Sequence, residues 1–251
     1  MEIINIDKDT NLLLPLINDD VKIFINNCKA FITDISNGNK EIYVNGGELE
    51  YCHIRDSEVK TNNIIKVNNG KCTINILDLI SKDGDNSYTL ILDSEYDNIE
   101  FNVASISKSN VSKSYMIQSN NNITDTSVKI DCFGIVEDTS KLKYDITSFI
   151  KNGAKRSVVN QNSKILLFDK ESIGINNPIL EIEENDVKAN HGSSIGMIDE
   201  ETLFYLTSRG IEEHVARNLV SMGKISYMIE KIKDEKIRNE LLERMWKYER
   251  L

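Results

Sequence analysis

The amino-acid sequence predicts a mainly β protein that ends in a short helical segment. Between about residues 21 and 168, apolar side chains recur at every second position, as on the buried face of a pleated strand. Clusters of Asn, Asp, Gly and Ser, which favour turns, separate these short runs. After Ile198 the apolar period becomes that of amphipathic helices.

Each alternating run places one set of side chains on a common face. The runs are Val21, Ile23 and Ile25; Cys72, Ile74 and Ile76; Phe101 and Val103; Val128, Ile130 and Cys132; and Ile165 and Leu167. Turn signals lie between them at residues 37–39, 45–47, 68–70 and 83–85. We find no amphipathic helix of ten or more residues in this region, which disfavours folds built from βαβ units. A sandwich, a barrel and a β-solenoid remain open.

Three helices are expected after Ile198. The first follows the acidic residues 199–201, which suit the positive end of a helix, and stops at Gly210. The second is expected from about Glu212 to Met222, before Gly223, and the third over residues 226–248 with an interruption near Asp234. The wide apolar stripe of the third predicts packing on the β region in preference to binding a partner helix. We therefore expect a β core over residues 1–195 and a helical domain over residues 196–251.

Composition narrows the classes of partner. The 251-residue chain has a formal net charge of -10, which argues against nucleic acid because phosphate binding depends on clustered Lys and Arg. No apolar run approaches the ~20 residues that cross a bilayer, so no membrane segment is expected. The first ten residues alternate apolar with charged side chains instead of forming a signal-peptide core, and we expect a cytoplasmic protein.

The four cysteines and two of the three histidines are interpreted as structural or solvated. Cys28, Cys52, Cys72 and Cys132 include no CxxC pair, which excludes zinc-ribbon and thioredoxin motifs and predicts free thiols in a cytosol. Their separations fit solenoid coils of about 20 residues, but small apolar cysteines filling a core are the preferred interpretation. His53 points away from Cys52 if both lie on one strand, and is interpreted as structural. His214 is expected to be solvated.

One stretch of the sequence carries a distinctive motif. Residues 186–211 read DVKANHGSSIGMIDEETLFYLTSRGI and resemble the signature of the SufB/SufD family of the SUF iron–sulfur cluster assembly system, DVKxxHGATxGxxDEExLFYLxSRGI. The rare LFYL-x-SRG core makes the match distinctive. Weaker matches extend the resemblance over roughly residues 146–251.

The resemblance implies a right-handed parallel β-helix core followed by a small C-terminal helical domain. It also implies a scaffold subunit that is not itself an enzyme, acts with a SufC-type ABC ATPase that hydrolyses ATP, and carries an iron–sulfur cluster transiently. Such subunits pair through the end of the β-helix, here with a second copy or a SufB-type paralogue. The pairing is expected through the last coils, residues 158–188.

The family motif implies roles for some residues of this chain, and the chain departs from the motif at others. His191 falls on the HGA histidine at the subunit interface, where imidazole suits iron ligation or proton transfer. We expect it between the last strand and the first helix, and the alternative is a residue that caps this turn. Asn162 stands where SufB-type chains carry the cysteine that receives the nascent cluster, and Gly192 is likewise SufD-like. These departures put direct cluster ligation in doubt.

The ATPase is expected to dock on the first helix, through Leu203, Phe204, Tyr205, Leu206, Arg209 and Gly210. Two other functions stay open. The first is a purely structural SufD-like partner that does not ligate iron, which Asn162 favours. The second is a carbohydrate-active enzyme on a β-solenoid, which the lack of a signal-peptide pattern disfavours. We find no Walker loop, Gly-rich nucleotide fingerprint or nucleophile elbow.

Overall fold

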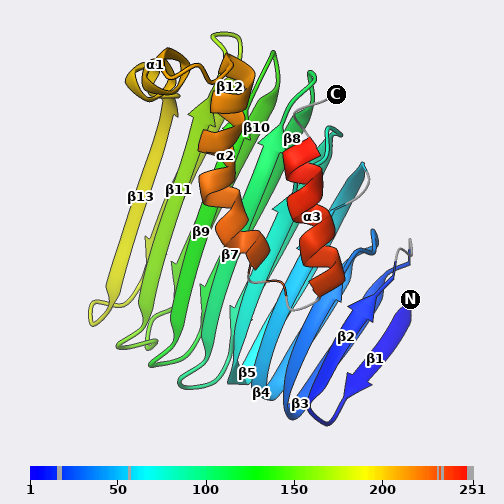
Figure 1. Cartoon of the computed structure of the whole chain (residues 1–251). Helices are drawn as coiled ribbons and strands as arrows, with labels where there is room; N and C mark the ends of the chain where they lie inside the picture. Colours follow the sequence, from blue (N-terminus) through cyan, green and yellow to red (C-terminus); the bar gives the residue numbers. More distant parts are fainter. Residues whose placement is uncertain (16–18, 56–57, 231, 233–234, 248–251) are drawn as a thin grey trace.

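The computed structural model describes all residues except 16–18, 56–57, 231, 233–234 and 248–251. In this part of the chain, thirteen parallel strands wind into one flattened solenoid, and three helices follow (Figure 1). The predicted parallel β-helix with a C-terminal helical segment is thus confirmed. The strands are β1 (Glu2–Ile6), β2 (Thr10–Leu14), β3 (Val21–Asp34), β4 (Lys40–Ile54), β5 (Val59–Asp78), β6 (Gly84–Leu92), β7 (Asn98–Ser107), β8 (Ser112–Asn121), β9 (Ser127–Val136), β10 (Lys141–Ile150), β11 (Val158–Leu167), β12 (Ile173–Ile182) and β13 (Lys188–Met197).

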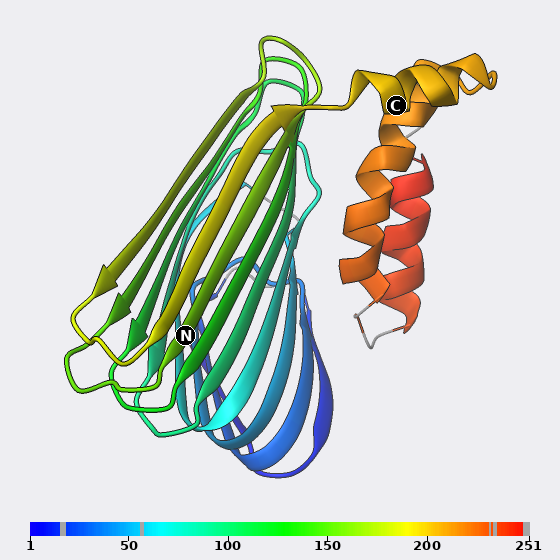
Figure 2. The same cartoon turned by 90° about the vertical axis from the view of Figure 1, so that its left-hand side faces the viewer.

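The coils form two opposed faces (Figure 2). Face A contains β1, the first halves of β3, β4 and β5, and then β6, β8, β10 and β12. Face B contains β2, the second halves of the same three strands, and then β7, β9, β11 and β13. The change occurs within β5, whose residues up to Val67 pair with β6 and whose residues from Lys71 pair with β7. All pairings are parallel, so each residue stacks on its register partner in the next coil.

The coils lengthen along the solenoid. Hydrogen bonds between register partners join residues 19 apart at Asn26 and Asn45, and 29 apart at Ser119 and Ser148. Further along, the bond from Asn177 to Asp145 spans 32 residues and the bond from Asn190 to Asn160 spans 30. Because the repeat length changes from coil to coil, the sequence shows no fixed period.

The corner between the two faces keeps one backbone conformation. A residue with a positive φ of 52° to 77° occurs there in six successive coils: Asn27, Gly46, Asn69, Tyr96, Asp125 and Arg156. Gly47 follows with φ 89°, and a Cβ on it would lie 2.1 Å from the carbonyl oxygen of Cys28. A larger residue at position 47 would therefore clash with the coil below.

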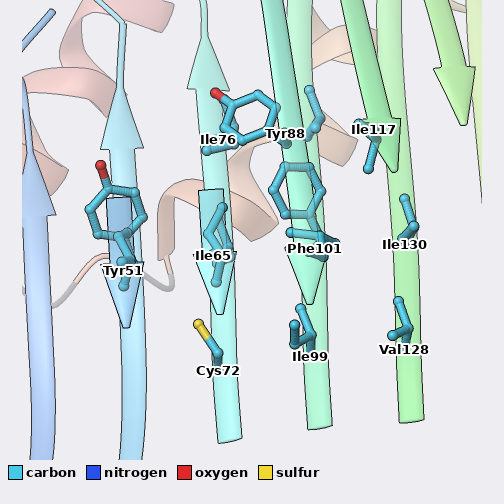
Figure 3. Packing of buried hydrophobic residues seen from close by; sticks show 14 of the residues in the cluster. Tyr51, Ile65, Cys72, Ile76, Tyr88, Ile99, Phe101, Ile117, Val128 and Ile130 are labelled. Carbon is cyan, nitrogen blue, oxygen red and sulfur yellow. The ribbon is translucent and has the colours of Figure 1, made fainter. Parts of the chain in front are cut away.

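The interior is an apolar stack between the faces. Ile, Val, Leu and aromatic side chains from both faces meet there in register (Figure 3). The rings of Tyr88 and Phe101 lie 4.9 Å apart between centroids, and those of Tyr115 and Tyr144 lie 5.6 Å apart. This burial supplies the main stabilising contribution, at roughly 1.5–3 kcal/mol for each fully buried large apolar side chain.

The interior also encloses charges. Lys113 is fully buried and donates to a carboxylate oxygen of Asp78 at 2.7 Å and to the carbonyl oxygens of Ile80 and Ile106. Arg55 and the Tyr115 hydroxyl donate to the same carboxylate. Burial lowers the pKa of Lys113 and raises that of Tyr115 well above its usual range. This network closes the interior at the second corner.

The helices are α1 (Glu200–Ser208), α2 (Glu213–Glu230) and α3 (Glu235–Lys247). The helices α2 and α3 lie against the outer side of face B (Figures 1 and 2). They bury a second cluster that contains Leu77, Ile106 and Ile135 from the strands, and Ile225, Ile229 and Leu241 from the helical segment. Arg217 links α2 to the solenoid, because its guanidinium donates a hydrogen bond to the carbonyl oxygen of Phe168 at 2.8 Å. The expected packing of the helical segment on the β region is confirmed.

Two expected helix limits are wrong. The second helix runs through Gly223 to Glu230, so the residues expected to begin a separate third helix belong to α2. Packing explains the difference, because Ile225 and Ile229 are fully buried against face B and outweigh a glycine cost of about 1 kcal/mol. The helix restarts at Glu235. Asp234 and Tyr248, named in the prediction, lie outside the described residues.

Candidate functional site

The solenoid is open at its C-terminal coil. Among the described residues, β12 and β13 each pair on one side only, with β10 and β11, and thus leave one edge uncovered. Positions that are buried in the interior of earlier coils are exposed here, because no further coil in the described part of the chain covers them. Ile182, Ile195 and Met197 are 43%, 44% and 49% exposed. Together with His191 they form what we call the terminal face.

His191 lies in the middle of β13, which corrects the expected position between the last strand and the first helix. It is the register partner of Gln161 in β11. Residues Val159, Gln161 and Ile165 are buried and point inward, so alternation turns His191 toward the interior as well. Because His191 is in the final coil, its imidazole is exposed at the open end of the lumen.

Beneath His191 the lumen is polar instead of apolar. The amide nitrogen of Gln161 donates to the hydroxyl of Ser148 at 2.7 Å and to the carbonyl oxygen of Ile179 at 3.0 Å. Ser148 in turn is 2.7 Å from the hydroxyl of Ser119. Within the described part of the chain, Gln161 Oε1 and Ser163 Oγ are buried without a hydrogen-bond partner. We call this region, formed by Ser119, Ser148, Gln161 and Ser163, the terminal lumen.

The polar residues of the terminal lumen leave a signal in the sequence. Ser119, Ser148, Gln161 and Ser163 occupy inward positions that earlier coils fill with apolar side chains such as Leu90, Ile130 and Cys132. Polar side chains at core positions of an alternating strand are unusual and indicate a site or a buried network.

Asn162 and Gly192 lie on the other side of face B. They are register partners, and both are exposed. Because adjacent residues of a strand point to opposite faces, Asn162 does not share the lumen with His191. The structure thus separates two positions that the family motif associates with cluster assembly.

The first helix presents only part of its predicted docking surface. Phe204 and Tyr205 are 74% and 56% exposed, and the guanidinium of Arg209 lies 5.0 Å from the centroid of the Tyr205 ring. Leu203 instead packs against the cluster under α2 and α3, and Leu206 is half-buried.

The ends of α1 follow the sequence signals. The carboxylate of Asp199 caps the helix by accepting from the main-chain N–H groups of Glu201 and Thr202. Gly210 has the positive φ expected after a helix.

The cysteines are core residues. All four are buried and free, and Cys52 belongs to the cluster under the helices whereas the other three are inside the solenoid. Burial raises the pKa of Cys52 to about 12 and raises that of Cys72 and Cys132 further. Thiols in such surroundings are poor nucleophiles and poor ligands. In the described part of the chain, no three His, Cys, Asp or Glu side chains converge as a metal site.

The other two histidines agree with their interpretation. His53 is buried and lies 3.0 Å from the carbonyl oxygen of Ser36, and burial lowers its pKa. His214 is exposed beside Glu212. None of the described helices combines the length and apolarity that a bilayer-spanning segment requires.

Comparisons with known proteins agree with this architecture. Residues 19–224 match the model of the family described as SUF system FeS cluster assembly, SufBD core domain. The chain is 32% identical over 109 residues to the iron–sulfur cluster assembly protein SufD of Bacillus subtilis, which covers 43% of this chain and 25% of the relative. It is 38% identical over 68 residues to SufD of Escherichia coli, covering 27% and 16%. An iron–sulfur cluster assembly SufBD family protein of Mycobacterium tuberculosis is 48% identical over 65 residues, covering 26% and 16%.

The matched segments span a quarter or less of the length of these relatives. The family model, in contrast, covers most of the chain and includes both the solenoid and the start of the helical segment. The chain belongs to the SufBD family of SUF-system iron–sulfur cluster assembly proteins.

Proposed function

We propose that this protein is a cytoplasmic scaffold subunit of iron–sulfur cluster assembly. It pairs end to end with a second copy or a SufB-type paralogue, and it docks a SufC-type ATPase that hydrolyses ATP. The observation that carries the proposal is the terminal face, where His191 stands among exposed apolar side chains on two uncovered strand edges. Edges of this kind need a partner to pair their main-chain groups.

In this arrangement His191 ligates iron of the nascent cluster or moves a proton. A neutral imidazole is a borderline-soft ligand and also titrates near neutral pH. The cluster is the cargo of the assembly and not a resident cofactor. A single imidazole leaves most iron positions unfilled, so the paired subunit supplies the remaining ligands.

The ATPase docks on the exposed side of α1. Phe204 and Tyr205 offer large aromatic surfaces, and Arg209 stacks on Tyr205. Exposed aromatic and Arg side chains are the residue types that dominate binding energy at protein interfaces. Since α1 directly follows β13, a force applied by the ATPase would reach the terminal face through residues 198–199.

A second candidate is a purely structural partner that binds the ATPase and does not ligate iron. The burial of all four cysteines and the outward direction of Asn162 favour it. The two candidates differ in the role of His191: the scaffold needs its imidazole for cluster assembly, and the structural partner does not.

The experiment compares His191→Ala with His214→Ala in cells that also produce the ATPase and the paired subunit. Both histidines are exposed, so neither change should shift the melting temperature. We expect lower cluster content, measured by absorption after anaerobic purification, with His191→Ala only. Full cluster content with His191→Ala would exclude the ligand role and leave the structural one.

A further inference from the structure

Gln161 is the neighbour of His191 across the strand pair. The two residues are register partners in β11 and β13, about 4.8 Å apart across the ladder. Their side chains point to the same side of the sheet, with Gln161 3% exposed below and His191 at the open end. Gln161 is thus the buried side chain next to the candidate ligand.

The orientation of the Gln161 amide is fixed by its partners. Its nitrogen lies 3.0 Å from the carbonyl oxygen of Ile179, which can only accept a hydrogen bond. The contact with Ser148 at 2.7 Å holds the same nitrogen from a second side. The amide oxygen therefore occupies the remaining direction, where it is buried and has no partner among the described residues. A buried acceptor without a donor is uncommon and points to a group that arrives later.

We propose that Gln161 is a positioning residue for His191. Its Oε1 accepts the N–H of one ring nitrogen of His191, holds the imidazole in one neutral tautomer and leaves the other nitrogen directed at the open end. Ligating histidines commonly donate their second ring N–H to an acceptor in this way. The use of the oriented nitrogen as an iron ligand rests on the proposed function. The hydrogen bond between Gln161 and His191 does not depend on it.

The hydrogen bond can be tested in the full chain without a cluster. Side-chain ¹⁵N spectra of histidine-labelled protein at about pH 8, above the usual pKa of a histidine side chain, distinguish the two tautomers. The His191 signal is assigned by its absence from His191→Ala. We expect one dominant tautomer in the unmodified chain, a mixture in Gln161→Met, which lacks the acceptor, and one tautomer again in Gln161→Glu, which retains it.

Two further variants make the test specific. Ser163→Ala removes another buried polar atom from the terminal lumen, but its register partner is Ser193, so the His191 signal should not change. Ser148→Ala removes an acceptor that holds the Gln161 amide, and it should produce a mixture even if Gln161→Met fails to fold. Identical His191 signals in the unmodified chain, Gln161→Met and Ser148→Ala would overturn the proposal.

Cluster content in cells separates this proposal from the function on which it rests. We expect Gln161→Met to lower it by about tenfold, as is typical when the acceptor behind a ligating histidine is lost, and Gln161→Glu to restore it. A tautomer mixture with unchanged cluster content would contradict the role of His191 in assembly and leave the Gln161–His191 hydrogen bond standing.

Discussion

The ammonium nitrogen of Lys113 lies 2.7 Å from a carboxylate oxygen of Asp78, and both side chains are completely buried inside the solenoid. Arg55 contacts the other oxygen of the same carboxylate. Two buried cationic side chains thus share one buried carboxylate. Water does not reach these buried charges. They are stabilised instead by their contacts with one another and by the main-chain carbonyl oxygens of Ile80 and Ile106.

Asp78→Ala should therefore destabilise the fold strongly. It leaves Lys113 and Arg55 buried without their shared carboxylate, and breaking one side of a buried pair costs roughly 3–5 kcal/mol. The free energy of unfolding from denaturant titration measures this loss. Asp85→Ala is the control, because Asp85 pairs with Lys60 at 3.2 Å on the surface and such pairs contribute at most about 1 kcal/mol. Equal losses in the two variants would contradict the assigned role of the buried network.

The alternating region predicted from the sequence, residues 21–168, spans β3 to β11 but not β1, β2, β12 or β13. Residues 188–197 read KANHGSSIGM, and their Gly, Ser and Asn content is typical of a turn. They form a strand because their main chain pairs with β11 along its whole length, which depends little on the side chains. The prediction that places His191 after the last strand is therefore wrong, whereas its role, which only the family motif implies, stays a prediction.

The sequence pattern does not predict that the strands wind into a solenoid. Coil length changes along the chain, so no repeat marks the solenoid, and the resemblance was needed to choose it over a sandwich or a barrel. The site was predicted only in part for a similar reason. The motif identifies His191, but the inward position of Gln161 becomes meaningful only when the register between β11 and β13 is known.

Stability at alkaline pH should depend on the Cys52 thiol. Burial raises its pKa to about 12 from a usual value near 9. Below pH 9 both folded and unfolded chains keep the proton, whereas above it the unfolded chain loses the proton and the folded chain retains it. The folded state then binds more protons, so the free energy of unfolding falls as pH rises, by up to ~1.4 kcal/mol per pH unit for one group.

Cys52→Ala removes this dependence. Its free energy of unfolding should fall less steeply than that of the unmodified chain between about pH 9 and pH 10.5, whatever the absolute cost of the substitution. Other buried groups, including the tyrosines inside the solenoid, titrate equally in both proteins and cancel in the difference. Denaturant titrations at several pH values measure the two slopes. Parallel curves would show that the thiol ionises equally in the two states.

Phe204→Ser and Tyr205→Ser should weaken ATPase binding without loss of stability. Both side chains are mostly exposed on α1, so the folded chain loses few contacts. An aromatic anchor at an interface typically contributes about 2 kcal/mol or more, which is more than tenfold in affinity. Titration calorimetry with a purified SufC-type ATPase measures the change, and melting temperatures check the fold. Met116→Ser, at 58% exposure on face A, is the control. Unchanged affinity in the α1 variants would place the docking surface elsewhere.

Pairing through the terminal face should be sensitive to charge at Ile195 and insensitive to charge at Ile179. The two side chains are 44% and 46% exposed and belong to the same last coil. Ile195 points inward at the open end of the lumen, where the paired subunit would cover it, whereas Ile179 points outward from face A. A lysine at position 195 would have to be desolvated in the interface, and a lysine at position 179 would remain in water.

Light scattering of the chain together with its ATPase measures the number of solenoid subunits in the assembly. We expect two solenoids in the unmodified protein and in Ile179→Lys, and a one-to-one complex with the ATPase in Ile195→Lys. Melting temperatures should agree among the three proteins, because both positions are exposed in the single chain. If Ile179→Lys separates the solenoids and Ile195→Lys does not, the subunits meet side by side across face A instead of end to end, and His191 then lies outside the interface.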